Sequence, residues 1–239
     1  MKAAILAILA CIIGCGSISR ADDWATPLRR QMVELDIKAR GIKDERVINA
    51  MSLVPREKFV HPEIAKLAYD DKPLPLGDGQ TITQPYVVAY MTEALKLKGD
   101  EKVLEIGTGS GYHSAVLAEL ASKIYSIEIR KRFADSAAER LKDMGYNNVS
   151  VKNADGYDGW PEHGPFDAVI ITCAANHVPP PLLAQLKTGG RLVVPLGSTR
   201  YFQTLTLITK TQKGFTTEHL IDVRFVPMIG KSLEEKPKK

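Results

Sequence analysis

The chain has 239 residues, of which 44% are hydrophobic and 25% charged, and its formal net charge is +4. This composition is ordinary for a soluble globular protein and allows one large domain with a sizeable core. The charge is mild and no basic stripe is interleaved with aromatic side chains, which argues against a nucleic-acid partner.

The first 21 residues have the pattern of a leader, either a signal peptide or a lipoprotein leader. A positive start precedes an uninterrupted run of apolar and small residues from 3 to 15, and residues 19–21 (Ser-Arg-Ala) match a small-x-small cleavage site. The run is too short to predict a stable membrane span. Residues 12–15 (Ile-Ile-Gly-Cys) also resemble a bacterial lipobox, which would make Cys15 a lipid-carrying amino terminus. An ordinary hydrophobic extension or a misplaced start codon are the alternatives.

Residues 22–84 are predicted to form a mainly helical segment. Between residues 25 and 67, apolar side chains stand at near-helical spacing at Leu28, Met32, Leu35 and Ile37. Gly41 is expected to end the first helix, and Asp44 to cap a second, short one that Pro55 stops. Residues 70–80 contain two prolines and two glycines and are therefore predicted to be a loop.

Residues 85–231 are predicted to form a Rossmann-like, doubly wound α/β core. A helix is expected at residues 85–97, with Pro85 in its first turn. Strand patterns follow at 102–106, 123–127, 149–152, 168–172 and 191–195, separated mostly by helical patterns at 112–120, 131–144 and 180–186. This alternation predicts a mostly parallel sheet with helices on both faces. Residues 202–209 and 215–225 are predicted to close it with an antiparallel hairpin, and residues 232–239 to be a basic, flexible tail.

The fold is not expected to depend on a disulfide bond. Cys11 and Cys15 belong to the leader, so Cys173 has no partner for an internal disulfide. Cys173 follows an apolar run and is expected to be a buried structural side chain.

The most informative motif is the glycine loop that follows the first core strand. Its sequence is G-x-G-x-G, whereas dinucleotide-binding folds use G-x-G-x-x-G around a pyrophosphate. With the acidic residue before it, the loop resembles the S-adenosylmethionine (SAM) loop of class I methyltransferases. The cofactor-binding residues predicted here are Glu105, Gly107, Thr108, Gly109 and Gly111.

Acidic residues end the next two strands. Glu128 follows the second strand about 20 residues after the first glycine, where it can accept hydrogen bonds from both ribose hydroxyls. Asp155 and Gly156 follow the third strand, where a short acidic side chain can reach an adenine amino group. A surface charge at Glu128 and a plain turn at Asp155-Gly156 are the alternatives.

One segment before the core indicates which family of methyltransferases the chain resembles. Residues 73–86 read PLPLGDGQTITQPY, which closely resembles the signature PLPIG-x-GQTISQPY of protein-L-isoaspartate O-methyltransferases. The resemblance continues through VLEIGTGSGY at 103–112, FDAVIITCAA at 166–175, LKTGGRLVVPLG at 186–197 and VRFVP at 223–227. It covers residues 28–231, and the ordered set is far more specific than any single motif.

The resemblance implies methyl transfer from SAM to the free α-carboxylate of L-isoaspartyl residues in damaged proteins. It makes residues 22–84 the substrate side and assigns a catalytic, carboxylate-orienting role to Thr83, where the family usually has serine. Substrate-binding residues are then Ile82, Gln84, Pro85, Tyr86, Val223, Phe225, Val226 and Pro227. His113 stands where members often carry an amide and is expected to line the cofactor loop without a catalytic role. No Cys, His or Asp spacing indicates a metal site.

Other functions stay open. A small-molecule O-methyltransferase would share the SAM loop but would not need residues 80–86, and a non-catalytic isoaspartyl- or SAM-binding receptor would explain Thr83. An amino-methylating nucleic-acid enzyme is disfavoured because residues 172–175 read Thr-Cys-Ala-Ala. We expect a monomer that acts in the cytoplasm, where SAM is made, although the leader also allows an exported or lipid-anchored protein.

Overall fold

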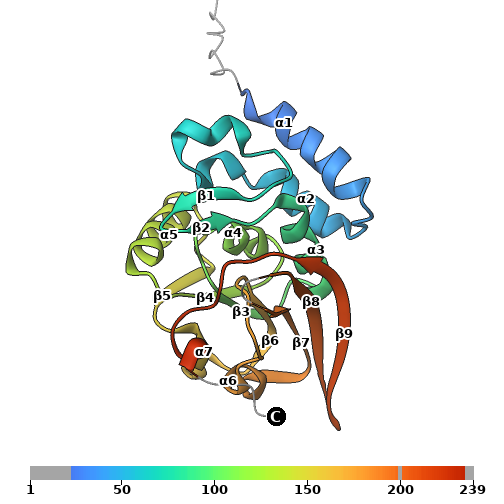
Figure 1. Cartoon of the computed structure of the whole chain (residues 1–239). Helices are drawn as coiled ribbons and strands as arrows, with labels where there is room; N and C mark the ends of the chain where they lie inside the picture. The colour runs from blue at the N-terminus through green and yellow to red at the C-terminus, as the bar shows by residue number, and fades with distance from the viewer. Residues whose placement is uncertain (1–22, 199–200, 235–239) are drawn as a thin grey trace, which may run out of the picture.

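The computed structural model describes residues 23–198 and 201–234, so the predicted leader lies outside the described residues (Figure 1). Its centre is a seven-stranded sheet of order β5-β4-β3-β6-β7-β8-β9. The strands are β3 (Lys102–Ile106), β4 (Lys123–Glu128), β5 (Val149–Asn153), β6 (Phe166–Ile171), β7 (Leu186–Gly197), β8 (Gln203–Thr211) and β9 (Gly214–Val223). The first five strands in this order pair in parallel, whereas β8 and β9 pair antiparallel. The predicted sheet and closing hairpin are therefore confirmed.

Helices cover both faces of the sheet because its central strands are apolar on both faces. Val103 of β3 joins a core formed with α3 (Pro85–Leu95), α4 (Tyr112–Ala118) and the N-terminal segment. Its neighbour Leu104 joins a second core formed with α6 (Pro180–Ala184). Figure 1 shows the N-terminal helices above the sheet and α6 below it. Helix α5 (Lys131–Asp143) packs on β4 and β5, and the short 3-10 turns η4 (Gly156–Asp158) and η5 (Pro161–His163) follow β5.

The first helix changes its winding partway along. Helix α1 (Ala25–Gln31) continues into a π-helix, η1 (Met32–Lys38), and Gly41 ends the run with φ +98° as predicted. The predicted apolar stripe is wrong at Leu35, which is 59% exposed. In a π-helix the hydrogen bonds join residues five apart, so Met32 and Ile37 share the buried face and Leu35 turns outward.

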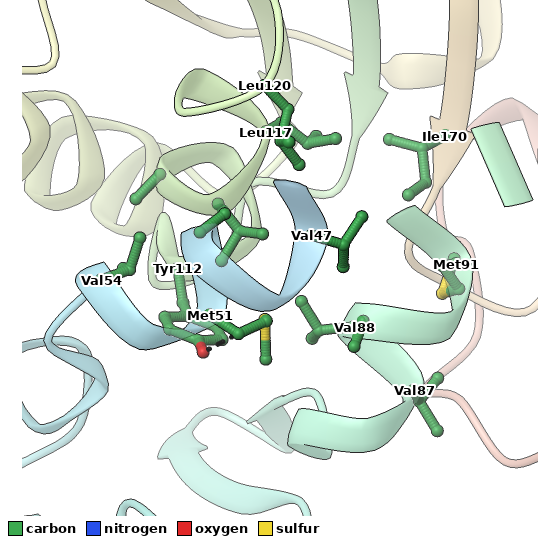
Figure 2. Packing of buried hydrophobic residues seen from close by; sticks show 14 of the residues in the cluster. Val47, Met51, Val54, Val87, Val88, Met91, Tyr112, Leu117, Leu120 and Ile170 are labelled. Atoms are coloured by element: carbon green, nitrogen blue, oxygen red, sulfur yellow. Dashed lines mark hydrogen bonds between the residues drawn. The ribbon is translucent and has the colours of Figure 1, made fainter. Parts of the chain in front are cut away.

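The next helix connects the N-terminal segment to the core. Asp44 caps α2 (Glu45–Leu53) by accepting a hydrogen bond from the Arg46 amide, as expected. Figure 2 shows side chains of α2 packed towards Tyr112 of α4 and Val88 of α3, with Met51 hydrogen bonded to the Tyr112 hydroxyl. Two 3-10 turns, η2 (Arg56–Phe59) and η3 (Pro62–Leu67), then lead to the substrate-side loop.

The loop predicted at residues 70–80 contains a small hairpin instead. Strands β1 (Leu74–Gly77) and β2 (Gln80–Ile82) pair antiparallel. Asp78 and Gly79 both have positive φ, 51° and 70°, which suits a tight turn between two strands. The prolines indicated a loop, but an isolated edge strand tolerates proline because its outward amide needs no partner.

The flexible tail predicted at residues 232–239 is wrong for its first residues. Helix α7 (Lys231–Glu234) occupies its first residues, and Ser232 is buried. The Lys231 amide donates to the Asp155 carboxylate, which ties this turn to the end of β5. The domain therefore extends to at least residue 234.

Across residues 23–198 and 201–234, no helix combines the length and apolar character that a bilayer span requires.

Candidate active site

A cavity of about 830 Å³, including its open mouth, lies at the carboxyl ends of β3, β4 and β6. The chain order reverses there, since β3 leads on to β4 and β5 at one side while β6 and β7 lie at the other. Ligands bind at such switch points in open α/β sheets. The predicted site residues that line this cavity are Ile82, Thr83, Gly107, Thr108, Gly109, Glu128, Gly156, Val226 and Pro227.

Gly107 shapes the part of the cavity where SAM, the methyl donor, is predicted to bind. We call this part the donor side. Its φ is +102°, and a Cβ there would lie 2.5 Å from the Thr172 hydroxyl oxygen. That hydroxyl lies 2.7 Å from the Gly107 carbonyl oxygen and 3.0 Å from that of Ile106, while the Gly107 amide donates to Ile127. The bend is thus fixed from β4 and β6 together, and only glycine fits it.

Gly111 is the glycine of the predicted SAM loop that packs against a helix. It has φ +88° at the start of α4 and does not line the cavity. A Cβ at Gly111 would lie 3.2 Å from Leu141 of α5. This glycine therefore permits close packing of two helices.

Glu128 lines the cavity with a nearly buried side chain. One carboxylate oxygen accepts the Gly109 amide at 2.9 Å and the other accepts the Arg130 amide at 2.9 Å. A carboxylate has about four acceptor sites, so lone pairs remain for a pair of ligand hydroxyls. Its position agrees with the predicted ribose contact, which stays a prediction.

Glu105 lies beneath the loop and does not line the cavity. It is fully buried, and its Oε2 accepts hydrogen bonds from the Ser114 and Ser126 hydroxyls while Oε1 has no partner among the described residues. The Ser126 hydroxyl lies 2.6 Å from that of Thr108, so Glu105 reaches the cavity wall through two hydroxyls. Burial raises the pKa of Glu105 to about 7, against the lowering effect of both serines.

Asp155 and Gly156 are neighbours in the sequence, but only one of them lines the cavity. Asp155 caps η4 by accepting the Tyr157 amide and also accepts the Lys231 amide, both at 2.9 Å, and it does not line the cavity. Gly156 does line it, and a Cβ there would lie 2.3 Å from a methyl carbon of Ile106. The adenine contact predicted for Asp155 remains a prediction.

Thr83 lies between β2 and α3, at the part of the cavity predicted to take the substrate carboxylate. We call this part the acceptor side. It is half-buried, and it lines the cavity next to Ile82. Gln84, Pro85 and Tyr86 do not line the cavity but start α3.

Asp71 holds the residues after Thr83. Its carboxylate accepts the Gln84 side-chain amide at 2.7 Å and the Tyr86 backbone amide at 2.9 Å. The backbone amide of Tyr86, a residue predicted to bind the substrate, is therefore already hydrogen bonded to a side chain of the protein.

Residues 223–227, at the end of β9 and just after it, also have part of their hydrogen-bonding capacity used within the protein. Val223 is buried in the core, and the Phe225 amide donates to Gln203 at 2.8 Å. The Ala174 amide donates to the Val226 carbonyl at 2.8 Å, and Pro227 pairs with Ala174. Of the substrate-binding residues predicted in this segment, Val226 and Pro227 line the cavity, whereas Val223 and Phe225 do not.

His113 lines the cavity as expected for a residue of the cofactor loop. The Thr92 hydroxyl donates to the Val88 carbonyl at 2.7 Å, so it accepts from His113 Nε2 at 2.9 Å. Burial lowers the pKa of His113 to about 3, helped by the nearby charge of Arg56. The imidazole is thus neutral at physiological pH.

Cys173 is a half-buried residue that lines the cavity, and burial raises the pKa of its thiol to about 12. A thiol of this pKa is not a nucleophile at neutral pH. The prediction that Cys173 is a buried structural side chain is therefore wrong in its burial, because the residue is half-buried and reaches the cavity.

Sequence reasoning missed three side chains that organise the site: Arg56, Asp71 and Thr172. Arg56 donates to the Thr83 carbonyl at 2.7 Å, from a turn 27 residues earlier in the chain. A buried charged residue in a short 3-10 turn leaves no periodic signal. Within the described parts of the chain, no group of three or more His, Cys, Asp or Glu residues could hold a metal ion.

Comparison with known proteins agrees with this geometry. Residues 28–233 match the family model described as "Protein-L-isoaspartate(D-aspartate) O-methyltransferase (PCMT)". A protein-L-isoaspartate O-methyltransferase of Opitutus terrae is 51% identical over 223 residues, which cover 93% of this chain and 96% of the relative.

Two solved structures share the fold. One, titled protein-L-isoaspartate O-methyltransferase, has a TM-score of 0.78 and 29% identity and covers 85% of this chain and 67% of its own. Another, a Plasmodium falciparum protein named for the same activity and solved with S-adenosyl-L-homocysteine, has a TM-score of 0.70 and 26% identity, covering 86% of this chain and 98% of its own. The chain belongs to the protein-L-isoaspartate(D-aspartate) O-methyltransferase family.

Proposed function

We propose that this chain moves the methyl group of SAM to the free α-carboxylate of L-isoaspartyl residues in damaged proteins and peptides. The observation that carries the proposal is that Thr83 and the Gly107–Gly109 bend, which come from separate parts of the chain, line one cavity. Family membership supports both the donor and the acceptor.

The donor side suits a nucleoside without phosphates. Glu128 retains lone pairs for ribose hydroxyls, and Arg130 is the cationic residue among those lining the cavity. Gly107, Thr108, Gly109, Glu128 and Gly156 would hold SAM. When bound, SAM supplies a methyl carbon on a sulfonium, so that the carboxylate oxygen bonds to carbon while the electron pair of the broken C–S bond stays on sulfur.

The protein's task in this transfer is positioning rather than acid–base catalysis, since a carboxylate is already ionised at neutral pH. The Thr83 hydroxyl would donate a hydrogen bond to one carboxylate oxygen and leave the other free to attack. Holding two reacting groups in line can contribute roughly 7–11 kcal/mol in favourable cases. Threonine keeps the hydroxyl of the family's usual serine, and its branched Cβ restricts χ1.

The methyl ester activates the damaged residue for repair. The backbone amide nitrogen that follows attacks the ester carbonyl, methanol leaves, and a succinimide forms. Water then opens the ring, and part of the product is normal aspartate. No residue of this chain is required after the ester leaves the site.

Methyl transfer to a matched pair of peptides tests the proposal. We expect labelled methyl to pass from SAM to an L-isoaspartyl peptide and not to its aspartyl twin. Thr83→Ala should lower kcat/KM on the isoaspartyl peptide by about 100-fold because an orienting donor is lost, while Thr83→Ser keeps most of the rate. Full turnover by Thr83→Ala would refute the orienting role.

The same assay separates the rival functions. SAM binding without transfer to either peptide would favour a non-catalytic receptor. Transfer to small carboxylic acids in preference to the isoaspartyl peptide would favour a small-molecule O-methyltransferase.

We also propose a monomer that acts in the cytoplasm, where its donor is made. Sedimentation of the purified protein tests the first part. Cell fractionation with amino-terminal sequencing of the native protein tests the second, because a chain beginning at Asp22 or at a lipidated Cys15 would mean export.

A further inference from the structure

The side chain of Arg56 is a fully buried cation next to the acceptor side of the cavity. It is 0% exposed, and Figure 2 shows the neighbouring Val54 and Tyr112 in the same packed cluster. Its Nε donates to the Ala68 carbonyl and its Nη2 to the Thr83 carbonyl, both at 2.7 Å. Arg56 thus holds the backbone of the residue expected to orient the substrate.

The charge of Arg56 is not paired within the described residues. No described carboxylate forms an ion pair with it, and Nη1 is buried without a hydrogen-bond partner. Asp71 acts on it at longer range, but the Asp71 carboxylate already pairs with Arg40 and accepts hydrogen bonds from Gln84 and Tyr86. Burial consequently lowers the pKa of Arg56, against the opposing effects of Tyr112 and Asp71.

Burying a charge without a partner is costly, so an unpaired guanidinium in a core calls for a compensating interaction. The Tyr112 ring supplies part of it, since Arg56 Cζ lies 4.6 Å from the ring centroid. Tyr112 and Thr83 both line the cavity, so Arg56 lies directly behind its acceptor wall. An anion in the cavity next to Thr83 would feel this charge through a low-dielectric layer.

We infer that Arg56 is a positioning residue for the acceptor carboxylate. It fixes Thr83 through the Thr83 carbonyl, and its buried charge makes that part of the cavity select an anionic group over a neutral one. This inference deepens the proposed function and rests on it. Arg56 would therefore be the reason that the enzyme accepts a peptide with a free α-carboxylate and rejects the corresponding carboxamide.

The test compares two ligands on the holoenzyme with saturating SAM. One is an L-isoaspartyl peptide, and the other is the same peptide with its α-carboxylate replaced by a carboxamide, used as a competitive inhibitor. For the wild-type protein the ratio of the carboxamide Ki to the carboxylate KM measures the selection for charge. Arg56→Gln should lower this ratio by about tenfold, because an opposite charge at close range is lost.

Arg56→Lys keeps the charge but lacks the planar fork that binds two carbonyls. We expect it to keep most of the charge selection and to lose roughly tenfold in kcat, because Thr83 is no longer held. The SAM dissociation constant, measured calorimetrically on each preparation, should change by less than about twofold in both variants if only the acceptor side is affected.

Arg46→Gln is the matched control. Like Arg56, Arg46 is an arginine that donates to two carbonyls, those of Leu97 and Leu120 at 2.6 and 3.0 Å. It is only partly buried, and it does not contact Thr83. Its loss should leave the ratio unchanged. A purely structural role for Arg56 would weaken the carboxylate and the carboxamide alike.

A wild-type ratio in Arg56→Gln would overturn the inference. If Arg56→Gln does not bind SAM, and so does not fold, Arg56→Lys decides, and wild-type kcat and KM in that variant would overturn it instead. Failure of the wild-type protein to methylate the isoaspartyl peptide is a separate outcome, which would refute the proposed function.

Discussion

The two loops that meet at the cavity are held by different parts of the chain. The donor loop at Gly107 is fixed entirely by core strands, through Ile127 of β4 and through Thr172 at the end of β6. The acceptor loop at Thr83 is held by Arg56 and Asp71, which come from the N-terminal segment. Donor binding and acceptor binding should therefore respond to different mutations.

The largest effect is expected at the donor loop. Gly107→Ala places a side chain at φ +102° and forces a contact with the Thr172 hydroxyl. Strained backbone of this kind costs roughly 1–3 kcal/mol before the clash is counted, so the SAM dissociation constant should rise by about 100-fold or more. Calorimetric titration with SAM measures the change.

Gly145→Ala is the control for backbone strain alone. Gly145 has φ +85° with nothing within 4 Å of an added Cβ, and it is exposed after α5. It should lose stability without losing SAM affinity. Equal SAM affinities for Gly107→Ala and the wild-type protein would contradict the role of the bend.

The next effect concerns the buried acid beneath the donor loop. The pKa of Glu105 is raised from 4.5 to about 7, so the folded state holds this proton more tightly than the unfolded state does. Its contribution to stability is complete below pH 4.5 and is lost as the pH rises through 7. By linkage the loss is about 3 kcal/mol.

Urea unfolding at pH 5 and pH 8 measures this effect. The wild-type protein should lose stability between the two values relative to Glu105→Gln, which cannot ionise. Glu139→Gln, an exposed substitution on α5, should follow the wild-type protein. Parallel behaviour of the wild-type protein and Glu105→Gln would show that Glu105 does not titrate in this range.

A smaller and more selective effect is expected on the acceptor side. Asp71→Asn weakens the acceptor of the Tyr86 and Gln84 amides and should cost about 1–3 kcal/mol of stability. The KM for the isoaspartyl peptide should rise several-fold while the SAM dissociation constant stays unchanged. Asp70→Asn breaks only an exposed ion pair with Lys72 and serves as the control. A change in SAM affinity as large as the change in KM would break the distinction between the two loops.

The smallest effect is expected at Arg40, which lies 3.5 Å above the Tyr86 ring and pairs with Asp71 at the surface. Arg40→Met should cost about 1 kcal/mol or less, because the guanidinium is partly exposed. Thermal unfolding compares it with Lys131→Met, which breaks only an exposed pair with Asp135. A loss similar to that of Asp71→Asn would mean that Arg40, rather than Asp71, stabilises the acceptor loop.

Local patterns predicted most of the core and the donor side. The strand patterns, the caps at Gly41 and Asp44 and the Gly107–Gly111 loop depend on neighbours close in sequence, and such signals can be read from one chain. The errors at Leu35 and at the β1–β2 hairpin arose where a π-helix and an isolated strand pair replaced the usual periodicity.

By itself, the sequence determined the family and the doubly wound core, and it supplied the set of residues predicted to bind the donor. Only the tertiary structure decided which of them reach the cavity. Glu128 and Gly156 line it, whereas Glu105 lies behind its wall and Asp155 binds the Lys231 amide outside it. Only the tertiary structure also shows that Arg56 donates to the Thr83 carbonyl. The physical reason is that a contact between residues 27 positions apart in irregular backbone is set by packing, which leaves no pattern along the chain.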